Sequence, residues 1–258
     1  MIDFIRETAE EFYGIKTDPD DVKKFLEYLR EAYSIVDGEI IKKAFFSGEA
    51  ARFLTVNETY FFREPAHFEL IKGLLPLYQT KGIRICSAAA ASGCEAYSIA
   101  MLIEAYNKGL EKPLPYHIDA FDINPKMIEL AEQGIYTEHS LREDGSSFRY
   151  LADSFLKKMP DQSGELKKFI VDPGLKKNIN FFVYNLNNLL PSKAYDIIFF
   201  RNVFIYLTLK SRERALSNLA AVLKDGGILL LGISETAGAR HPGLEQINQN
   251  GVFYFRKK

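Results

Sequence analysis

Residues 57–64 carry a concentration of polar chemistry that no regular element explains. They read Asn-Glu-Thr-Tyr-Phe-Phe-Arg-Glu, so amide, hydroxyl, aromatic, guanidinium and carboxylate groups lie close together in the chain. Polar side chains fall in both phases of the helical period and of the strand period, so neither a helix face nor a strand face accounts for them. The segment therefore either lies over a polar ligand or forms an amphipathic turn between two helices.

Two acidic residues follow short apolar runs that are typical of buried strands. The run Ile83–Cys86 leads into a loop of small residues, after which Glu95 begins a helix, and the run His117–Phe121 ends at Asp122. An acid at the end of the second strand, as Asp122 is, binds ribose hydroxyls in nucleotide-binding α/β folds. Glu95 could instead pair with the helix dipole, and Asp122 could cap a loop. Only Gly93 of the dinucleotide pattern GxGxxG is present, which argues against NAD.

Further polar residues follow the later apolar runs. Asn185 and Leu186 come after the third main run, Arg201 and Asn202 after the fourth, and Tyr206 lies in the next loop. An asparagine and a leucine can bracket an adenine, although an asparagine at a strand end is also a common turn residue. A solvated strand end would explain Arg201 but accounts poorly for Asn202.

The elements that position these residues alternate in type. Strands are expected over 83–86, 117–121, 196–200 and 227–231, and helices over 94–107, 125–133 and 209–223. This alternation predicts a doubly wound, mostly parallel α/β sheet, whose strands end at one common edge where ligands bind. The last β-rich run, 251–256, can enter such a sheet antiparallel.

Two regions depart from this alternation. Residues 1–56 indicate helices, because Val22, Phe25 and Leu29 form an apolar stripe behind an Asp18-Pro19 helix start. The first fifty positions hold 12 acidic and 7 basic residues, a net charge of −5. Residues 138–180 predict an inserted β subdomain with an irregular helix and a hairpin, whose arms are 169–171 and 179–183.

The composition excludes several classes of protein. The net charge is −1, and 47% of the residues are hydrophobic against 26% charged, which is ordinary for a globular protein and unlike a nucleic-acid binder. No apolar run approaches the roughly 20 residues of a membrane span, and no signal peptide is evident. Cys86 and Cys94 form no metal-binding pair. We expect a cytoplasmic monomer without a metal, without nucleic acid and without insertion into a membrane.

Six segments, taken in order, resemble one family. They are NETYFFRE (57–64), SAAAASGCEAYSIAM (87–101), AFDINPKMIELAEQGIY (120–136), YNLNN (184–188), FFRNVFIYL (199–207) and GGILLLGISET (226–236). Together they are similar to the CheR family of S-adenosylmethionine-dependent chemoreceptor glutamate O-methyltransferases. The resemblance covers about residues 50–258. It implies a small all-α N-terminal domain (1–56) and a Rossmann-like class I methyltransferase domain (57–258) that carries the small β subdomain at about 138–180.

The resemblance also implies a site and partners. Arg63 and Tyr206 would face the transferred methyl group and the substrate carboxylate. S-adenosyl-L-methionine would be the cofactor, S-adenosyl-L-homocysteine the product, and chemoreceptor cytoplasmic helices or another protein the substrate in chemotactic signal transduction. The implied cofactor contacts are Asn57, Thr59, Arg63, Glu95, Asp122, Asn185, Leu186, Arg201 and Asn202.

The chain departs from the family at two places. Where the resemblance leads us to expect Gly-Glu-Glu-Pro-Tyr, it reads Gly93-Cys94-Glu95-Ala96-Tyr97. Cys94 is either a small neutral filler or a thiol whose pKa is lowered by a helix start. The N-terminal segment is acidic, and an acidic receptor would repel it unless its lysines form a local patch. Two alternatives therefore stay open: the same fold could methylate a different protein or carboxylate substrate, or it could be a cofactor-binding regulatory module with little activity.

Overall fold

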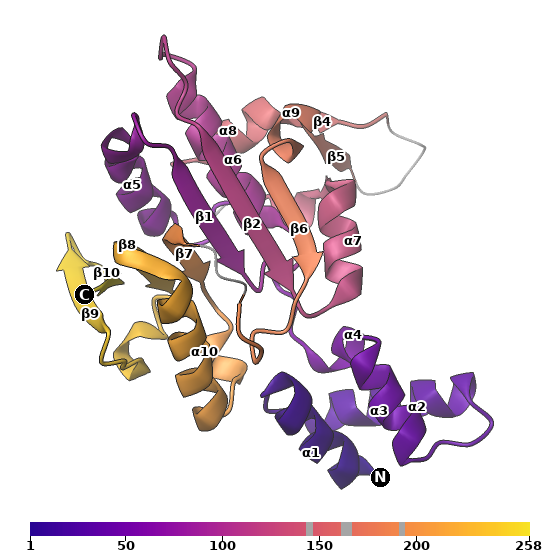
Figure 1. Cartoon of the computed structure of the whole chain (residues 1–258). Coiled ribbons are helices and arrows are strands. Elements are labelled where there is room, and N and C mark those ends of the chain that lie inside the picture. The colour runs from indigo at the N-terminus through magenta and orange to yellow at the C-terminus, as the bar shows by residue number, and fades with distance from the viewer. Residues whose placement is uncertain (143–146, 161–166, 191–193) are drawn as a thin grey trace.

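The computed structural model describes residues 1–142, 147–160, 167–190 and 194–258. It has a helical part at the N-terminus and an α/β part that holds the sheet. The arrowheads of β1, β2 and β6 point toward the helical part (Figure 1). The helices therefore lie at the strand-end edge of the sheet, where the sequence predicts the site.

The helical part consists of short helices that pack around one apolar cluster. The helices are α1 (Ile2–Tyr13), α2 (Pro19–Ala32), α3 (Gly38–Phe46) and α4 (Ala51–Leu54). As predicted, the Asp18 side chain caps α2 by accepting a hydrogen bond from the Asp20 N–H, and the stripe residues Phe25 and Leu29 are fully buried. Asp37 caps α3 in the same way. Local caps and one apolar stripe thus set these helix boundaries.

Within the described residues, the main sheet has seven strands in the order β6-β2-β1-β7-β8-β10-β9. The strands are β1 (Ile83–Ala88), β2 (Tyr116–Asp122), β6 (Ile179–Val183), β7 (Tyr195–Phe200), β8 (Leu223–Leu231), β9 (Leu244–Gln249) and β10 (Val252–Lys257). Pairing is parallel from β6 to β8, and β10 is antiparallel to both neighbours, as predicted. The strand order reverses between β1 and β7, which is where open α/β sheets bind ligands.

Helices cover both faces of this sheet. The helices are α5 (Pro65–Leu74), continued by the 3₁₀ turn η1 (Leu75–Tyr78), α6 (Cys94–Asn107), α7 (Pro125–Gln133), and α10 (Leu209–Val222). Along β7, Ile197 and Phe199 join the core cluster that contains α5 and α6, whereas Ile198 and Phe200 join the cluster that contains α10. Because β7 is buried on both faces, its residues 197–200 are a continuous apolar run rather than an alternating one.

In the part of the chain that the structure describes, a second, antiparallel sheet has three strands in the order β3-β5-β4. Its elements are β3 (Ile135–Thr137), η2 (Glu138–Ser140), α8 (Arg149–Phe155), β4 (Leu156–Lys158) and β5 (Lys168–Val171). Parts of the predicted insertion, 143–146 and 161–166, lie outside the described residues.

The predicted hairpin in this region is wrong. Strand β5 pairs with β3 and β4, whereas Ile179–Val183 is β6 and pairs in parallel with β2 in the main sheet. Asp172-Pro173-Gly174 does not form a hairpin turn. Asp172 instead caps the short helix α9 (Pro173–Lys176) by accepting a hydrogen bond from the Gly174 N–H. Asp-Pro serves a helix start as well as a turn, and local sequence did not distinguish the two.

Candidate active site

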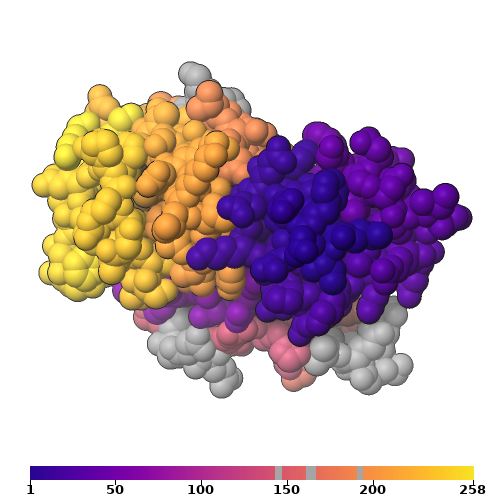
Figure 2. Space-filling view, turned by 90° about the horizontal axis from the view of Figure 1, so that it is seen from below, coloured from indigo at the N-terminus to yellow at the C-terminus, as the bar shows by residue number. Residues whose placement is uncertain are grey.

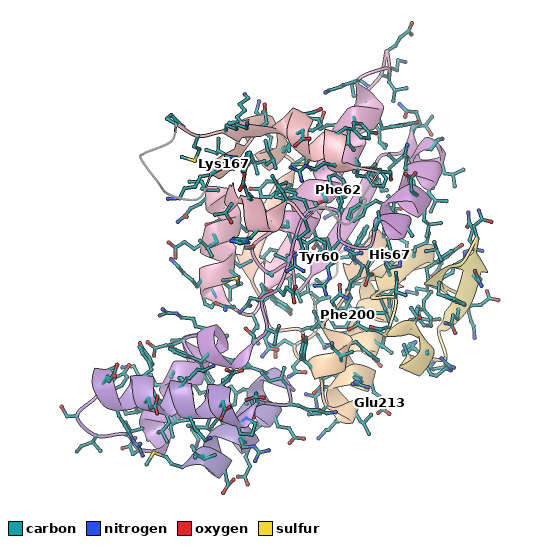
Figure 3. The ribbon with its side chains drawn as sticks, turned by 180° about the vertical axis from the view of Figure 1, so that it is seen from behind. Tyr60, Phe62, His67, Lys167, Phe200 and Glu213 are labelled. Atoms are coloured by element: carbon teal, nitrogen blue, oxygen red, sulfur yellow. The ribbon has the colours of Figure 1, made fainter. Side chains whose placement is uncertain are left out.

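A cavity of about 580 Å³ lies between the strand ends of the main sheet and the helical part. Tyr60 and Phe200 line it, and both lie where the sheet faces the helices (Figure 3). The structure brings every predicted site residue to its wall: Asn57, Thr59, Arg63, Glu95, Asp122, Asn185, Leu186, Arg201, Asn202 and Tyr206. This volume lies in the range of small-molecule sites, which is roughly 300–1,000 Å³.

The helical part supplies one wall of this cavity, which the sequence analysis did not predict. Tyr13, Ile15 and Leu54 are among the lining residues. The backbone after α1 pairs with the loop after β7: the Lys16 N–H donates to the Tyr206 carbonyl at 2.8 Å, and the Thr208 N–H donates to the Gly14 carbonyl at 2.9 Å. In Figure 2 the N-terminal residues, in indigo, lie directly against the orange residues of the α10 region.

The segment 57–64 is anchored by its aromatic residues. Phe61 and Phe62 are buried, and the Phe62 N–H donates to the Ser98 hydroxyl at 2.9 Å. Arg63 donates one hydrogen bond to the Glu58 carbonyl and lies over the Tyr60 ring at 5.5 Å from its centroid. The Arg63 guanidinium has no other hydrogen-bond partner within the described ranges, so donors remain for an anionic ligand in the cavity.

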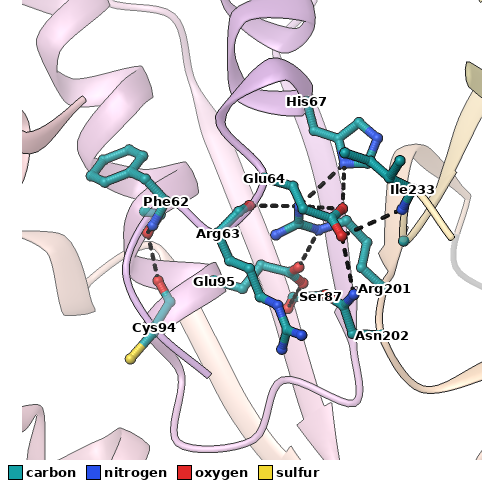
Figure 4. A network of polar contacts seen from close by, with 12 residues as sticks. Phe62, Arg63, Glu64, His67, Ser87, Cys94, Glu95, Arg201, Asn202 and Ile233 are labelled. Atoms are coloured by element: carbon teal, nitrogen blue, oxygen red, sulfur yellow. Dashed lines mark hydrogen bonds and ion pairs between the residues drawn. The ribbon is translucent and has the colours of Figure 1, made fainter. Parts of the chain in front are cut away.

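Arg201 is the centre of a buried ionic network (Figure 4). Its side chain is 2% exposed, and its Nε donates to Glu95 Oε2 at 2.8 Å. Its Nη1 donates to the Arg63 carbonyl at 2.7 Å and lies 3.4 Å from Glu64 Oε2. The guanidinium also lies over the Phe68 ring. Arg201 therefore connects the end of β7 to both α6 and the segment 57–64.

The sequence analysis assigned no role to Glu64 or to Glu235, although both belong to segments quoted for the resemblance. The Glu64 carboxylate accepts hydrogen bonds from the Asn202 side chain and the Ile233 N–H. Glu235 is 3% exposed and accepts bonds from the N–H groups of Gly232, Asn202 and Ile205. The only signal in the sequence was that each acid lies in a segment quoted for the resemblance. Their hydrogen-bond partners are distant in the chain, so only the fold reveals the contacts.

The two acids differ in their protonation behaviour. Burial alone would raise the pKa of Glu64, but the hydrogen bond with His67, the charge of Arg201 and the Asn202 amide lower it to about 2. Burial raises the pKa of Glu235, its three backbone donors oppose that rise, and the negative charge of Glu64 adds to it. Glu64 is therefore ionised over the working pH range and paired with the Arg201 cation.

Asp122 lies at the end of β2 and is 6% exposed. Its oxygens accept hydrogen bonds from the Ala91 N–H at 2.8 Å and the Asn124 N–H at 2.9 Å. Burial raises the pKa of Asp122, and these backbone donors partly offset the rise. Asp122 thus joins the small-residue loop after β1 to the end of β2, and its carboxylate lines the cavity.

Asn185 contacts the helical part. Its side-chain Nδ2 donates to the Phe12 carbonyl at 2.6 Å, and Asn187 donates to the same carbonyl at 3.2 Å. Asn185 and Leu186 nonetheless both line the cavity, and their contact with an adenine stays a prediction.

Cys94 is fully buried, and burial raises the pKa of its thiol to about 12. It is a neutral filler, and the alternative of a lowered pKa was wrong.

Comparison with known proteins decides the family. Residues 57–252 match the family described as CheR methyltransferase, SAM binding domain. The chain belongs to the CheR methyltransferase family. The matched residues begin at Asn57, the first residue of the segment that carries Arg63, and extend into β10. The match thus covers most of the α/β part of this chain.

Individual CheR relatives are similar over most of this chain. A chemotaxis protein methyltransferase from Borreliella burgdorferi is 34% identical over 71% of this chain and 65% of its own length. One from Vibrio parahaemolyticus is 35% identical over 78% of this chain and 73% of its own, and one from Listeria monocytogenes 30% over 83% and 79%. This chain thus spans about two thirds to four fifths of these relatives.

The solved structures are more distant. An rRNA methylase from Streptococcus thermophilus covers 73% of this chain and 94% of its own, at a TM-score of 0.40 and 12% identity. A similarity this low has no bearing on what the protein does.

Among the described residues, none of the helices has the length and apolar character that crossing a membrane requires.

Proposed function

We propose that the protein transfers a methyl group from S-adenosylmethionine to glutamate side chains of chemoreceptors, as a protein-glutamate O-methyltransferase. One observation carries this proposal: Arg63 and Tyr206 line the same cavity as Asp122 and Glu95 in a chain of the CheR family. The relatives are named chemotaxis protein methyltransferases, which supports a chemoreceptor as the substrate.

The residues of the cavity fit the cofactor chemically. Asp122 and Glu95 are carboxylates at a strand end and a helix start, where they would accept hydrogen bonds from ribose hydroxyls or bind the amino group of the cofactor. Asn185 and Leu186 would bracket the adenine, and Asn57 and Thr59 would cover the cofactor from the segment 57–64. The bound cofactor would supply a methyl group on a sulfonium cation and leave as S-adenosylhomocysteine.

The reaction asks the protein for orientation more than for proton transfer. A glutamate carboxylate is already ionised near neutral pH, so no strong general base is needed. Arg63 would hold this carboxylate with its remaining N–H donors, in line with the methyl group, and Tyr206 would border the same position. Attack by the carboxylate cancels both charges, so a cavity closed by the helical part favours the reaction by excluding water.

A second substrate class is favoured by the charge of the helical part. Lys23 and Lys24 on α2 are paired with Asp20 and Asp21 at 2.8 and 2.9 Å, so they present little net positive charge. An acidic receptor helix would gain little from such a surface. The same methyl transfer to another protein or carboxylate therefore remains the second candidate.

Replacement of Arg63 tests this function. We expect Arg63→Ala to lower methyl transfer at saturating cofactor by about 100-fold, because orientation effects of this kind reach that size. Titration calorimetry should still detect binding of S-adenosylmethionine. The matched control is Arg30→Ala, which removes an exposed arginine on α2 and should leave the rate unchanged. Near-normal turnover of Arg63→Ala would overturn the role of Arg63, and a wild-type chain that binds no cofactor would overturn the function.

A further inference from the structure

The residues around the proposed reacting centre adopt an unusual backbone conformation. Phe62 and Glu64, on either side of Arg63, have φ angles of 54° and 57°. Asn202, which precedes the loop that carries Tyr206, has a φ of 60°. Left-handed conformations are costly for residues with a Cβ and persist where surrounding contacts enforce them. Contacts of neighbouring residues therefore hold the backbone beside Arg63 and Tyr206 in place.

Glu64 supplies such contacts beside Arg63. Its side chain is 15% exposed, and its Oε1 accepts hydrogen bonds from Asn202 Nδ2 at 3.1 Å and the Ile233 N–H at 3.3 Å. Its Oε2 lies 3.4 Å from Arg201 Nη1, the same nitrogen that donates to the Arg63 carbonyl. Figure 4 shows these contacts converging behind Arg63, whose guanidinium points away from them. Glu64 thus fixes the backbone of Arg63 without touching its guanidinium.

Glu235 makes the equivalent contacts beside Tyr206. Its Oε2 accepts from the Asn202 N–H at 2.7 Å, and its Oε1 accepts from the Ile205 N–H at 3.2 Å. These two donors bracket the start of the 3₁₀ turn η3 (Phe204–Tyr206). The carboxylate therefore fixes the turn that ends at Tyr206.

The Glu64 and Glu235 carboxylates both accept hydrogen bonds from the backbone that directly follows β8. Glu235 also accepts from the Gly232 N–H at 2.8 Å, and Glu64 accepts from the next residue, Ile233. A Cβ on Gly232 would lie 2.7 Å from Glu235 Oε2 and 2.8 Å from Asn202 Nδ2, so the approach leaves no room for a side chain. The close packing at Gly232 therefore fixes the position of the Glu64 carboxylate relative to the Glu235 carboxylate.

We propose that Glu64 and Glu235 are positioning residues: Glu64 holds Arg63, and Glu235 holds Tyr206, at one fixed separation on the wall of the cavity. The proposal rests on the proposed function, since it assigns the reacting centre to Arg63 and Tyr206. Neither acid is catalytic, because each acts through the backbone of another residue.

A double-mutant cycle tests whether Glu64 acts through Arg63. We expect Glu64→Gln to lower kcat about 10- to 100-fold, the cost of a small misplacement, with the KM for S-adenosylmethionine within about threefold. In the Arg63→Ala background the same change should lower kcat no further. Glu235→Gln should behave likewise, with its effect lost in the Tyr206→Phe background. The control is Glu69→Gln, an exposed acid on α5, the helix that begins directly after Glu64. Additive effects, or a loss confined to KM, would refute the positioning role.

Hydrogen exchange gives a readout that does not depend on turnover. In Glu64→Gln, the Phe62 amide should exchange at least tenfold faster than in wild type, whereas amides in β1 should not change; Glu69→Gln should leave both as they are. Unchanged exchange at residues 61–64 would overturn the proposal even in an active enzyme. An inactive wild-type chain with this exchange response would overturn the proposed function and leave the structural assignment standing.

Discussion

The stability of the protein should depend on pH through Glu64 in a way that one substitution isolates. The folded-state pKa of Glu64 is lowered from 4.5 to about 2, despite burial, by His67, Arg201 and Asn202. Because the folded pKa lies below the unfolded one, ionised Glu64 stabilises the fold above about pH 5. This stabilisation is lost as the pH falls toward 2.

The size of the effect follows from the shift. A shift of this size corresponds to about 3 kcal/mol of stability above pH 5, at about 1.4 kcal/mol per pKa unit. At pH 3, where Glu64 is still mostly ionised in the folded state but protonated in the unfolded state, about 1 kcal/mol should remain. The free-energy difference between wild type and Glu64→Gln should therefore shrink by about 2 kcal/mol between pH 7 and pH 3.

Urea unfolding at pH 7, 5, 4 and 3 measures this difference directly. Asp122 has a raised pKa and gains stability on acidification, but Glu64 is not among the causes of that rise, so the contribution of Asp122 cancels in the comparison. The charge of Glu64 adds to the raised pKa of Glu235, so that share is part of the measured difference. Glu69→Gln should show a difference near zero at every pH, because that acid is half exposed and only weakly paired. A difference for Glu64→Gln that is constant with pH would refute the ionic account of the network.

Three further outcomes are expected. Arg201→Met should lower the free energy of unfolding by about 3–5 kcal/mol in urea titrations, because it leaves the partly buried carboxylates of Glu64 and Glu95 without their cation; Arg201→Lys should cost less. Asp122→Asn should weaken binding of S-adenosylmethionine about 10- to 100-fold in calorimetry, since a hydrogen bond to a charged group is lost. Gly93→Ala should destabilise the protein by about 1–3 kcal/mol in thermal melts, since φ is +86° and the new Cβ would lie 2.8 Å from the Ala131 Cβ.

Local signals were enough to predict much of the fold. Helices α6 (Cys94–Asn107) and α7 (Pro125–Gln133) lie where the sequence predicts them. Each follows an apolar run that is typical of a strand, and Pro125 is a residue that favours the first position of a helix. The common edge of the strand ends followed from parallel alternation, which is why Glu95, Asp122 and Arg201 could be expected near one another. The prediction of a hairpin turn at Asp172-Pro173-Gly174 was wrong because the same residue types also begin helices, as they do here in α9.

The remaining parts of the site depend on contacts that no local pattern encodes. Arg201 and Glu95 are 106 residues apart in the chain, and Glu64 and Asn202 are 138 apart. The wall that the helical part contributes depends on backbone pairing between Lys16 and Tyr206, which leaves no trace in side-chain composition. The cofactor contacts of individual residues came from the resemblance, and their shared position on one cavity is what the structure adds.

The most direct test of the central claim is transfer of labelled methyl from S-adenosylmethionine into a lysate of the source cell. We predict a label that mild base releases, as expected for a carboxyl methyl ester, on a protein of chemoreceptor size, and its absence with Arg63→Ala. A label that resists base, or a label on RNA, would contradict the claim that this cavity methylates glutamate carboxylates.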